Sequence, residues 1–465
     1  MRVEARQVAL QSRSPQRPDD LLVEVEEADT AAVDQAIELA REGARGWAAS
    51  SALQRSAALV AAADALAGAT AELTSLMVRE VGKPLTEASA EVSRAVGILR
   101  YYAQQALDPD GETYPGPLPA ALLLSRRRPR GVAGLITPWN FPIAIPLWKA
   151  APALAFGNAV VLKPSPDATA LALRLAELLA PTLPDHLFQV MPGGAATGKA
   201  VLERVDCMSF TGSVTIGHQV AVAATERGIP SQAEMGGLNA SIVLPDADPE
   251  RAATVIAGAA MGYAGQKCTA TSRAIVVGDP SSFTAALVEA IQGLPVGDPA
   301  EQGTVVGPLI TNQARRRVLE AAEEAVAAGG RLLTGGAVPE RTGWFIAPTL
   351  VDGISADARL AQEEVFGPIA VVLTVADEEE AVRVANGVRY GLVSSVFTRD
   401  LDRALRFADQ LDTGLIRVNA PTSGVDYLAP FGGEKDSSYG PREQGKAARD
   451  LYTSTRTITI VPQEG

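Results

Sequence analysis

Residues 131–163 read GVAGLITPWNFPIAIPLWKAAPALAFGNAVVLK. A short run with strand character, GVAGLIT, is followed by the helical segment IAIPLWKAAPALA and then by a second apolar run, AVVLK. This order is typical of a parallel sheet whose strands are joined by helices packed on its faces. Ligands of such sheets bind at the carboxyl ends of the strands. We therefore expect functional residues directly after GVAGLIT and AVVLK.

The same alternation extends in both directions along the chain. LFQVMPG leads to ATGKAVLE, CMSFTG leads to SVTIGHQVAVAATE, and SQAEMGG closes the set. A second alternating region, about 240–419, contains the strand-like runs SIVLPD, RAIVVG and IAVVLTV, whereas residues 28–105 have helical spacing. The sequence thus predicts an α/β protein. The tail YTSTRTITIVP predicts a terminal strand, whose partner is either the basic strand at 120–130 or another subunit.

Composition limits the possible functions. The chain of 465 residues suggests two or three domains, and its net charge of −13 argues against a nucleic-acid surface and against anionic membranes. No apolar run reaches membrane-spanning length, and the first residues, MRVEARQ, lack the apolar segment of a signal peptide. We expect a location in a reducing cytoplasm, because two cysteines are no disulfide framework. Metal ligands at the usual spacings are missing, so no metal is expected.

The stretch GYAGQKCTATSR (262–273) contains Cys268, which is a buried filler, a metal ligand or a nucleophile. The chain has only two histidines, His186 and His218, and neither is near a candidate nucleophile in sequence. If Cys268 is catalytic, its base is therefore expected to be a carboxylate. Cys207, in the strand-like run CMSF, is expected to be core filler.

Three motifs follow predicted strands. In TPWNFP (137–142), a stiff turn presents Asn140, whose amide suits an oxyanion; the alternative is a structural turn. In VVLKPSPD (160–167), Lys163 meets a cofactor ribose or phosphate, or is a solvated strand end. In FTGSVTIG (210–217), glycines at a helix start face a phosphate, or form a plain strand-to-helix turn.

Two further motifs contain carboxylates. In EMGG (234–237), Glu234 is a candidate general base toward water; the alternative is a capping or ion-paired glutamate. In EEVFGP (363–368), Glu364 suits ribose hydroxyls and Phe366 suits a nicotinamide ring, unless Phe366 anchors the loop in the core. Each motif alone fits a structural role as well as a functional one.

Together, the order and spacing of PWNFP, LKPS, FTGS, EMGG, GQKCTA, EEVFGP and PFGG resemble the aldehyde dehydrogenase superfamily over essentially the whole chain. The resemblance implies the aldehyde dehydrogenase fold, in which a Rossmann-like parallel-sheet coenzyme domain accompanies an α/β catalytic domain and a small β oligomerisation element. The implied boundaries are 1–110 and 130–235 for the coenzyme domain, 236–435 for the catalytic domain, and 111–129 and 450–465 for the oligomerisation strands. A homodimer or homotetramer is expected.

The resemblance also implies roles for individual residues. Cys268 attacks the aldehyde, Asn140 holds the oxyanion, and Glu234 activates the water that hydrolyses the thioester, which places the chain in the hydrolytic branch instead of the branch that uses coenzyme A. The implied cofactor-binding residues are Ile136, Thr137, Pro138, Trp139, Lys163, Ser165, Pro166, Gly212, Ser213, Gly217, Gly236, Glu364 and Phe366. Because Pro166 stands where many NAD-preferring relatives have a glutamate, we expect NADP to be usable as well as NAD.

The region 419–448 and the helix after NFP look most like 2-oxoglutarate-semialdehyde (2,5-dioxopentanoate) dehydrogenases. Trp148 replaces the arginine of many succinate-semialdehyde dehydrogenases. The residues expected to line the aldehyde tunnel are Trp148, Lys267, Thr269, Thr422 and Tyr427. The alternatives are a different aldehyde (aliphatic, aromatic, amino or succinate semialdehyde), a cysteine hydrolase without redox chemistry, and a non-catalytic binding protein.

Overall fold

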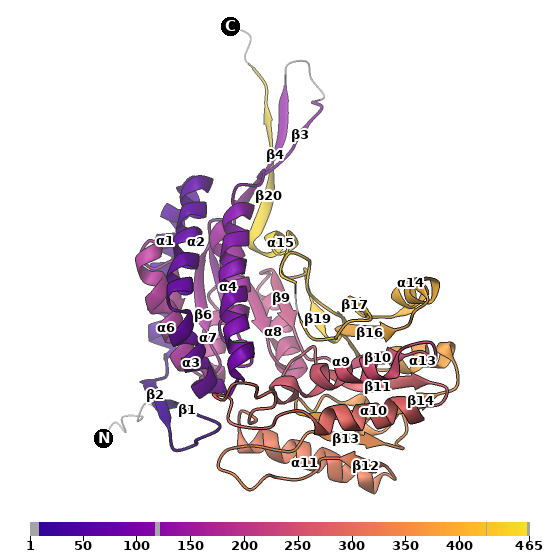
Figure 1. Ribbon diagram of the computed structural model, residues 1–465. Coiled ribbons are helices and arrows are strands. Elements are labelled where there is room, and N and C mark those ends of the chain that lie inside the picture. The colour runs from indigo at the N-terminus through magenta and orange to yellow at the C-terminus, as the bar shows by residue number, and fades with distance from the viewer. Residues whose placement is uncertain (1–8, 117–120, 425, 463–465) are drawn as a thin grey trace.

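The computed structural model describes residues 9–116, 121–424 and 426–462. The parts of the predicted coenzyme and oligomerisation segments at 1–8, 117–120 and 463–465 lie outside the described residues. Within the described residues the chain forms two α/β bodies side by side, and a narrow β arm projects from the first body (Figure 1). The α/β class predicted from the sequence is confirmed.

The first body contains a six-stranded sheet with the order β19-β9-β8-β5-β6-β7. All neighbours are parallel except β19, which is antiparallel to β9. The strands are β5 (Val132–Ile136), β6 (Ala159–Lys163), β7 (Phe188–Val190), β8 (Cys207–Thr211), β9 (Ser231–Glu234) and β19 (Ser438–Tyr439). The two residues of β19 lie more than 200 positions after β9, so the C-terminal part of the chain returns to complete this sheet.

Helices cover the six-stranded sheet (Figure 1). They are α1 (Thr30–Ala49), α2 (Ala52–Gly68), α3 (Thr70–Val81), α4 (Leu85–Gln105), α5 (Ala144–Ala155), α6 (Thr169–Leu179), α7 (Ala195–Leu202) and α8 (Val214–Glu226). Every residue of α5 is buried, because this helix packs between the sheet and α2 and α4. α2 begins with a capping box in which Ser51 and Gln54 bond each other's backbone.

The second body contains a seven-stranded sheet with the order β12-β13-β14-β11-β10-β16-β17. Only β12 is antiparallel. The strands are β10 (Asn239–Val243), β11 (Thr271–Val277), β12 (Arg331–Thr334), β13 (Thr349–Asp352), β14 (Ile369–Val375), β16 (Val393–Phe397) and β17 (Leu415–Val418). Its helices are α9 (Pro249–Met261), α10 (Ser281–Gln292), α11 (Asn312–Ala327), α12 (Arg359–Gln362), α13 (Glu378–Asn386) and α14 (Leu401–Gln410).

The arm is a three-stranded antiparallel sheet formed by β3 (Thr113–Tyr114), β4 (Leu122–Pro129) and β20 (Thr453–Ile460). β20 pairs with β4 from Thr453 opposite Pro129 to Ile460 opposite Leu122. The terminal strand thus takes the basic strand of its own chain as partner. The arm protrudes from the body and leaves the other edge of β20 unpaired within the described chain (Figure 1).

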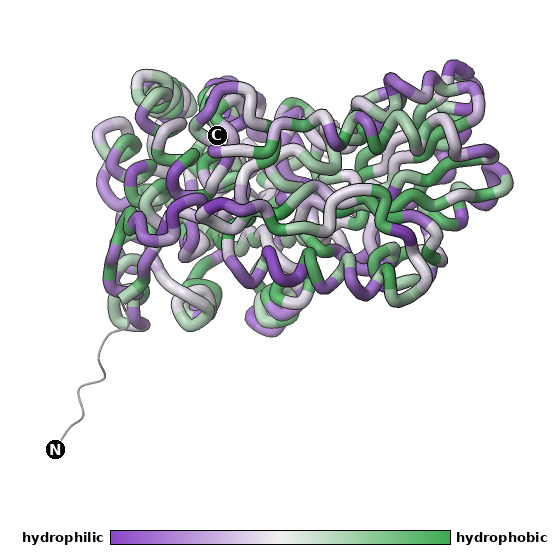
Figure 2. The backbone as a smooth tube through the Cα atoms, turned by 60° about the horizontal axis from the view of Figure 1, so that its bottom comes forward, coloured by the Kyte–Doolittle hydropathy of each residue, from purple (hydrophilic) through white to green (hydrophobic). Residues whose placement is uncertain are grey.

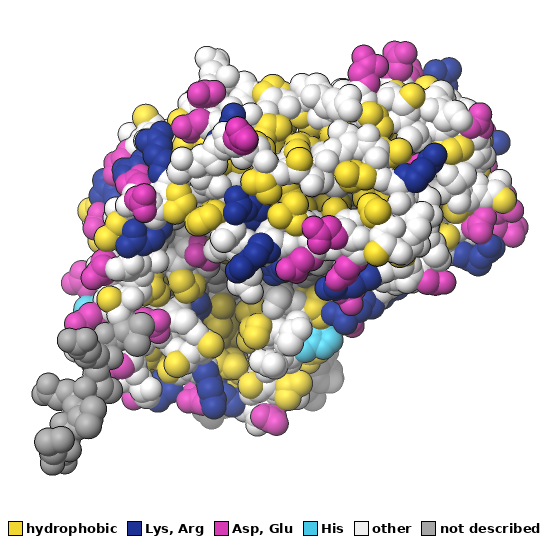
Figure 3. Space-filling view, turned by 90° about the horizontal axis from the view of Figure 1, so that it is seen from below, with side chains coloured by type: hydrophobic (Ala, Val, Ile, Leu, Met, Phe, Trp, Pro, Cys, Tyr) yellow, Lys and Arg dark blue, Asp and Glu magenta, His cyan; other side chains and the backbone are white. Residues whose placement is uncertain are grey.

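Two small ladders, β1 (Ala9–Arg13) with β2 (Leu21–Glu26) and β15 (Tyr390–Gly391) with β18 (Glu434–Lys435), and the helix α15 (Arg449–Tyr452) complete the elements. Hydrophobic segments run through the interior strands, and hydrophilic segments gather at the turns (Figure 2). Seen from below, acidic and basic side chains lie interspersed on the surface (Figure 3). Among the described helices none alone is long and apolar enough to cross a membrane; α2 and α3, bent by 68°, pass that test only as a pair.

Candidate active site

The carboxyl ends of β5, β6, β8 and β9 meet at one edge of the six-stranded sheet. The backbone N–H of Thr137, just after β5, donates to the carbonyl of Lys163 at the end of β6, 3.2 Å away. The side-chain oxygens of Thr137 and Thr211 are buried at this edge without a partner among the described residues. Buried polar atoms of this kind are rare in a finished structure, so this edge has hydrogen-bonding capacity for a ligand.

The loop that carries Cys268 is held in an unusual backbone conformation. Three successive residues, Tyr263, Ala264 and Gly265, have φ of 54°, 53° and 65°. This left-handed region is unfavourable for the two non-glycine residues, but burial of Tyr263 and the hydrogen bond from its hydroxyl to the Val81 carbonyl (3.1 Å) stabilise it. A Cβ on Gly265 would lie 2.2 Å from the carbonyl oxygen of Gly367. The sequence therefore fixes the path of the loop into Cys268.

Asn140 reaches the same loop from the turn after β5. Its Nδ2 donates to the carbonyl of Gln266, two residues before Cys268, at 3.0 Å. Its Oδ1 is buried without a partner among the described residues. An amide nitrogen carries two hydrogens, so one N–H orients the side chain and the second is left for a ligand atom beside Cys268.

Cys268 is partly exposed, and its carbonyl accepts from Asn239 Nδ2 at 2.8 Å. Burial of the sulfur, and then the nearby carboxylates of Glu364 and Glu234, raise the pKa of the Cys268 thiol above its ordinary value. Without a ligand the thiol is therefore protonated at neutral pH. Cys207, by contrast, lies fully buried in β8, where the sequence predicted core filler.

Glu234 ends β9 and is buried. Its two oxygens accept from Ser438 Oγ at 2.6 Å and from Gln232 Nε2 at 3.1 Å. Burial, and then the charge of Glu443, raise the pKa of Glu234 well above its ordinary value, whereas Ser438 and Lys149 oppose that rise. Glu234 is thus a carboxyl group with a strong affinity for a proton, as a general base requires.

Behind Glu234 lies a buried polar network that sequence reasoning missed. Lys149 on α5 forms an ion pair with Glu443 and donates to Ser209 Oγ at 2.7 Å. Ser209 in turn bonds Gln232 Oε1, also at 2.7 Å, so the network ends at the neighbour of Glu234. A lysine inside the apolar run IAIPLWKAAPALA was the available signal, because an unpaired charge cannot stay in a fully buried helix.

The pKa values of Lys149 and Glu234, at the two ends of this network, are shifted in opposite directions. Burial lowers the pKa of Lys149 from its ordinary value, although the attraction of Glu443 opposes that shift. The pKa of Glu234 is raised and that of Lys149 is lowered, so the two proton affinities approach one another.

Glu364, Gly236 and Phe366 meet across the boundary between the two sheets. The N–H of Gly237 donates to Glu364 Oε1 at 3.2 Å, and a Cβ on Gly236 would lie 2.1 Å from Glu364 Oε2. Phe366 has φ 59°, and its ring stands edge-on to that of Trp139 with 5.8 Å between centroids. Residues far apart in sequence therefore frame one cleft, and Gly236 is required because any side chain would displace the Glu364 carboxylate.

Lys163 lies at the end of β6 and donates to the carbonyl of Gly193 at 3.1 Å. Burial lowers the pKa of Lys163 to about 8, while the carboxylates of Glu27 and Asp167 oppose that shift. Ser165 and Pro166 form the start of a short 3-10 turn, and Ser165 Oγ accepts from the Asp167 N–H. Asp167 was not singled out from the sequence, yet its charge acts directly on Lys163.

At the end of β8, Gly212 and Gly217 let the first turn of α8 pack closely. A Cβ on Gly217 would lie 2.4 Å from Met235 Sδ, and one on Gly212 would lie 2.5 Å from the Phe210 ring. Ser213 is the N-cap residue of α8, but its side chain makes no capping bond. N–H groups at the start of α8 are therefore open to an anion.

These features fit a dinucleotide cofactor. Partnerless buried hydroxyls, a lysine, a free helix start and a carboxylate beside a glycine all lie along one sheet edge, which leads to Cys268. Ile136 at the end of β5, Pro138 and Trp139 are part-exposed at the same edge. Among the described residues no group of three or more His, Cys, Asp or Glu side chains is placed to hold a metal ion.

The residues predicted to line the aldehyde tunnel have different surroundings. Lys267 Nζ pairs with Glu87 at 2.7 Å. Tyr427 packs edge-on against Tyr101. Trp148 Nε1 donates to Glu443 at 3.0 Å and is buried, and Thr422 Oγ1 bonds Thr271 Oγ1 at 2.8 Å and is buried. Thr269 is also buried. A role of these residues in substrate binding stays a prediction.

The aldehyde dehydrogenase family matches residues 3–458 of the chain. An alpha-ketoglutaric semialdehyde dehydrogenase of Bacillus subtilis is 37% identical over 97% of this chain and 94% of its own length. An alpha-ketoglutarate semialdehyde dehydrogenase of Haloferax volcanii is 41% identical over 92% of this chain and 90% of its own length. The structure of an NAD-dependent aldehyde dehydrogenase from Sinorhizobium meliloti superposes with a TM-score of 0.95 at 32% identity, covering 99% of this chain and 93% of the other. The chain therefore belongs to the aldehyde dehydrogenase family and is an NAD(P)-dependent oxidoreductase.

Proposed function

We propose that this enzyme oxidises 2-oxoglutarate semialdehyde to 2-oxoglutarate, with Cys268 as the nucleophile and water as the acceptor of the acyl group. Two observations support the proposal. The Asn140 amide and the Glu234 carboxyl group converge on the Cys268 loop, and relatives in two organisms that carry this substrate in their names match over nearly the whole chain. The net reaction consumes aldehyde, NAD(P)+ and water and yields carboxylate, NAD(P)H and two protons.

In the first half of the reaction, the Cys268 thiol gives up its proton, the sulfur bonds to the aldehyde carbon, and the carbonyl electron pair moves onto oxygen. Loss of hydride from that carbon to a bound oxidised cofactor would re-form the carbonyl bond and leave a thioester. The second N–H of Asn140 Nδ2, together with the Cys268 backbone N–H, would stabilise that oxyanion. Removal of one such donor typically costs about a hundredfold in turnover. Lys163 and Glu364 would hold a nicotinamide dinucleotide at the sheet edge, and its oxidised ring would supply a positive charge and a hydride acceptor. This positive charge would favour the thiolate form of Cys268. Without it, the carboxylates of Glu364 and Glu234 disfavour the thiolate.

In the second half, the acyl group is bound to Cys268 as a thioester. Glu234 takes a proton from the attacking water, the new C–O bond forms, and the C–S bond breaks to release the carboxylate and the thiolate. Ser438 and Gln232 orient the Glu234 carboxylate through their hydrogen bonds. Glu234 would then release the proton to solvent, and the Lys149–Glu443 ion pair behind Gln232 sets the charge that acts on the Glu234 carboxyl group.

Cofactor choice is set in this proposal around Lys163. No glutamate stands at position 166, so a 2′-phosphate is tolerated, and both NADP and NAD are used. The carboxylates of Glu27 and Asp167 nevertheless offset part of the positive charge of Lys163. Their negative charges therefore disfavour a doubly charged phosphate. The balance between these charges, not one residue, determines the ratio of the two activities.

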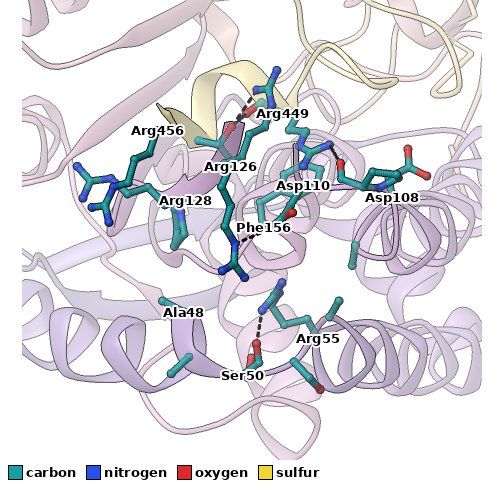
Figure 4. Close-up of a pocket in the computed structure, with 18 of the residues that line it drawn as sticks. Ala48, Ser50, Arg55, Asp108, Asp110, Arg126, Arg128, Phe156, Arg449 and Arg456 are labelled. Atoms are coloured by element: carbon teal, nitrogen blue, oxygen red, sulfur yellow. Dashed lines mark hydrogen bonds and ion pairs between the residues drawn. The ribbon is translucent and has the colours of Figure 1, made fainter. Parts of the chain in front are cut away.

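We also propose that the protein acts as a homodimer or homotetramer in the cytoplasm, assembled through the arm. A cavity of about 800 Å³ at the base of the arm is lined by six arginines: Arg55, Arg126, Arg127, Arg128, Arg449 and Arg456 (Figure 4). Arg126 and Arg456 stand directly opposite each other on β4 and β20, a pairing that like charges disfavour. Asp108 and Asp110 also line the cavity, and Arg126 and Arg127 pair with Asp110 and Asp450. The remaining arginines keep the cavity net positive on a chain of net charge −13, which suits an acidic surface of a second copy.

The proposed function is tested with the purified enzyme and a panel of aldehydes: 2-oxoglutarate semialdehyde, succinate semialdehyde, a neutral aliphatic aldehyde and an aromatic aldehyde, each with NAD and NADP. We expect the highest kcat/KM with 2-oxoglutarate semialdehyde. Equal or better turnover of the neutral aldehydes would contradict the substrate assignment. Ester hydrolysis without any reduction of cofactor would instead support a cysteine hydrolase.

A further inference from the structure

One face of α4 borders the region in front of Cys268. Glu87, Arg94 and Tyr101 are spaced seven residues apart, which is two helical turns, so the three side chains lie along one line of the helix. All three are half-buried, between the buried face of α4 and its solvent face. The line therefore runs along the border between the buried face and the solvent face of α4.

The first end of this line lies beside the nucleophile loop. Glu87 accepts from Lys267 Nζ at 2.7 Å, and Lys267 directly precedes Cys268. A Cβ on Gly262, in the same loop, would lie 3.2 Å from Glu87 Oε1 and 3.3 Å from Lys267 Nζ. The Glu87 carboxylate thus holds the Lys267 ammonium group against this face of α4, next to the loop that contains Cys268.

The other end of the line lies against the loop before Phe431. The ring centroids of Tyr101 and Tyr427 are 6.0 Å apart. A Cβ on Gly97, one turn after Arg94, would lie 2.7 Å from the Tyr427 hydroxyl. Arg94 is therefore located on α4 between the loop that leads into Cys268 and the segment around Tyr427.

Arg94 has no hydrogen bond, ion pair or ring contact with any described residue, although its side chain is half-buried. Glu91, one turn before it, is already bonded to Lys83 and to the N–H groups of Ile143 and Ala144. Arg100, on the solvent face of the same helix, pairs with Asp64 at 3.1 Å. In a chain with 54 acidic and 41 basic residues, the guanidinium of this half-buried side chain meets no carboxylate among the described residues and is open to an anionic ligand.

We propose that Arg94 binds the distal carboxylate of the substrate and that Lys267, restrained by Glu87, provides a second positive charge for the same group. The planar guanidinium offers two parallel N–H groups that match a carboxylate. This proposal rests on the proposed function and deepens it, because it explains how an aldehyde with an anionic end is selected although position 148 is tryptophan. Arg94 acts in substrate selection and takes no part in bond making at Cys268.

The test compares Arg94→Gln, Arg94→Lys and the control Arg100→Gln with wild type. We expect Arg94→Gln to lower kcat/KM for 2-oxoglutarate and succinate semialdehydes about 10- to 100-fold, mainly through KM, because loss of a hydrogen bond to a charged group typically weakens binding by about that factor. Turnover of pentanal should be unchanged or improved. Arg94→Lys should recover part of the loss, and Arg100→Gln should behave as wild type. Inhibition by glutarate, measured as a Ki, should weaken in parallel.

Two outcomes would overturn the inference. If Arg94→Gln lowers the kcat/KM of pentanal and of the semialdehydes by the same factor, Arg94 has a structural role. If the selectivity for anionic aldehydes and the glutarate Ki survive in Arg94→Gln, another group binds the carboxylate, while the proposed function stands. A wild-type enzyme that oxidises no aldehyde at all would contradict the proposed function itself.

Discussion

At the scale of the residue, the account depends on how the environment of each carboxyl group sets its proton affinity. Burial raises the pKa of Glu364 to about 7, and the hydrogen bond from Gly237 and the charge of Arg317 oppose that rise. A carboxylate accepts hydrogen bonds from ribose hydroxyls best when it is ionised. Cofactor affinity should therefore respond to pH in the neutral range.

We expect the Kd for NAD to fall as pH rises from 6 to 8, because Glu364 loses its proton in that interval. Glu364→Gln should bind the cofactor more weakly at pH 8 and should lose the gain in affinity between pH 6 and 7.5, leaving the effect of Lys163, whose pKa is about 8. Fluorescence titration across this range measures both. An identical pH dependence in wild type and Glu364→Gln would show that another group titrates.

Asp167 provides a second residue-scale prediction. Asp167→Asn removes a negative charge beside Lys163, so kcat/KM with NADP should rise a few-fold relative to NAD. Pro166→Glu adds a carboxylate and should shift the ratio toward NAD. Steady-state kinetics with both cofactors measure the ratio. If neither variant changes it, the 2′ position of the ribose lies away from these side chains.

At the scale of the element, α5 carries Lys149, whose buried ion pair with Glu443 lies behind Glu234. Breaking a buried ion pair leaves an uncompensated charge and costs about 3–5 kcal/mol. We therefore expect Glu443→Gln to lower the free energy of unfolding by roughly that amount and to change the pH dependence of thioester hydrolysis. Urea unfolding and stopped-flow kinetics measure the two effects.

A matched control for Glu443→Gln is Glu80→Gln. Glu80 is a buried carboxyl group that accepts from the N–H groups of Ala170 and Leu171 at the start of α6, and burial raises its pKa to about 7. Glu80→Gln should alter stability but leave the pH profile of hydrolysis as in wild type. Equal changes of the profile in both variants would mean that Glu443 acts only through folding.

Elements also show why part of the site was predictable from the sequence. Lys163 and Glu234 are the last residues of β6 and β9, and Asn140 lies in the turn after β5, so strand ends indicated them. Lys149 and Glu443 lie 294 positions apart and meet only through tertiary packing. The two-residue strand β19 has no periodicity to detect, and Arg94 was missed because its position depends on which face of α4 is covered.

At the scale of the whole molecule, the alternation of strands and helices was sufficient to predict the α/β fold. Sheet order was not predictable, because it depends on long-range pairing such as that of β19 with β9. The choice of partner for the terminal strand was also open in the sequence and is resolved by the register of β20 on β4.

The arginine-lined cavity leads to a prediction about assembly. If acidic groups of a second copy contact this patch, the oligomer should dissociate more readily at high salt, because surface charges are screened. Arg456→Gln should weaken the assembly, whereas Arg251→Gln, an exposed arginine on α9, should not. Sedimentation velocity at low and high NaCl measures both. Assembly insensitive to salt and to Arg456→Gln would exclude the patch from the interface.

The most direct measurement of the central claim is a single turnover of Glu234→Gln with cofactor and 2-oxoglutarate semialdehyde, stopped by acid and analysed by peptide mass spectrometry. The account predicts one equivalent of reduced cofactor and a thioester of the oxidised substrate on the peptide that contains Cys268, with slow release of product. Reduced cofactor formed at the wild-type rate by Cys268→Ala, or an acyl group attached to any other residue, would contradict it.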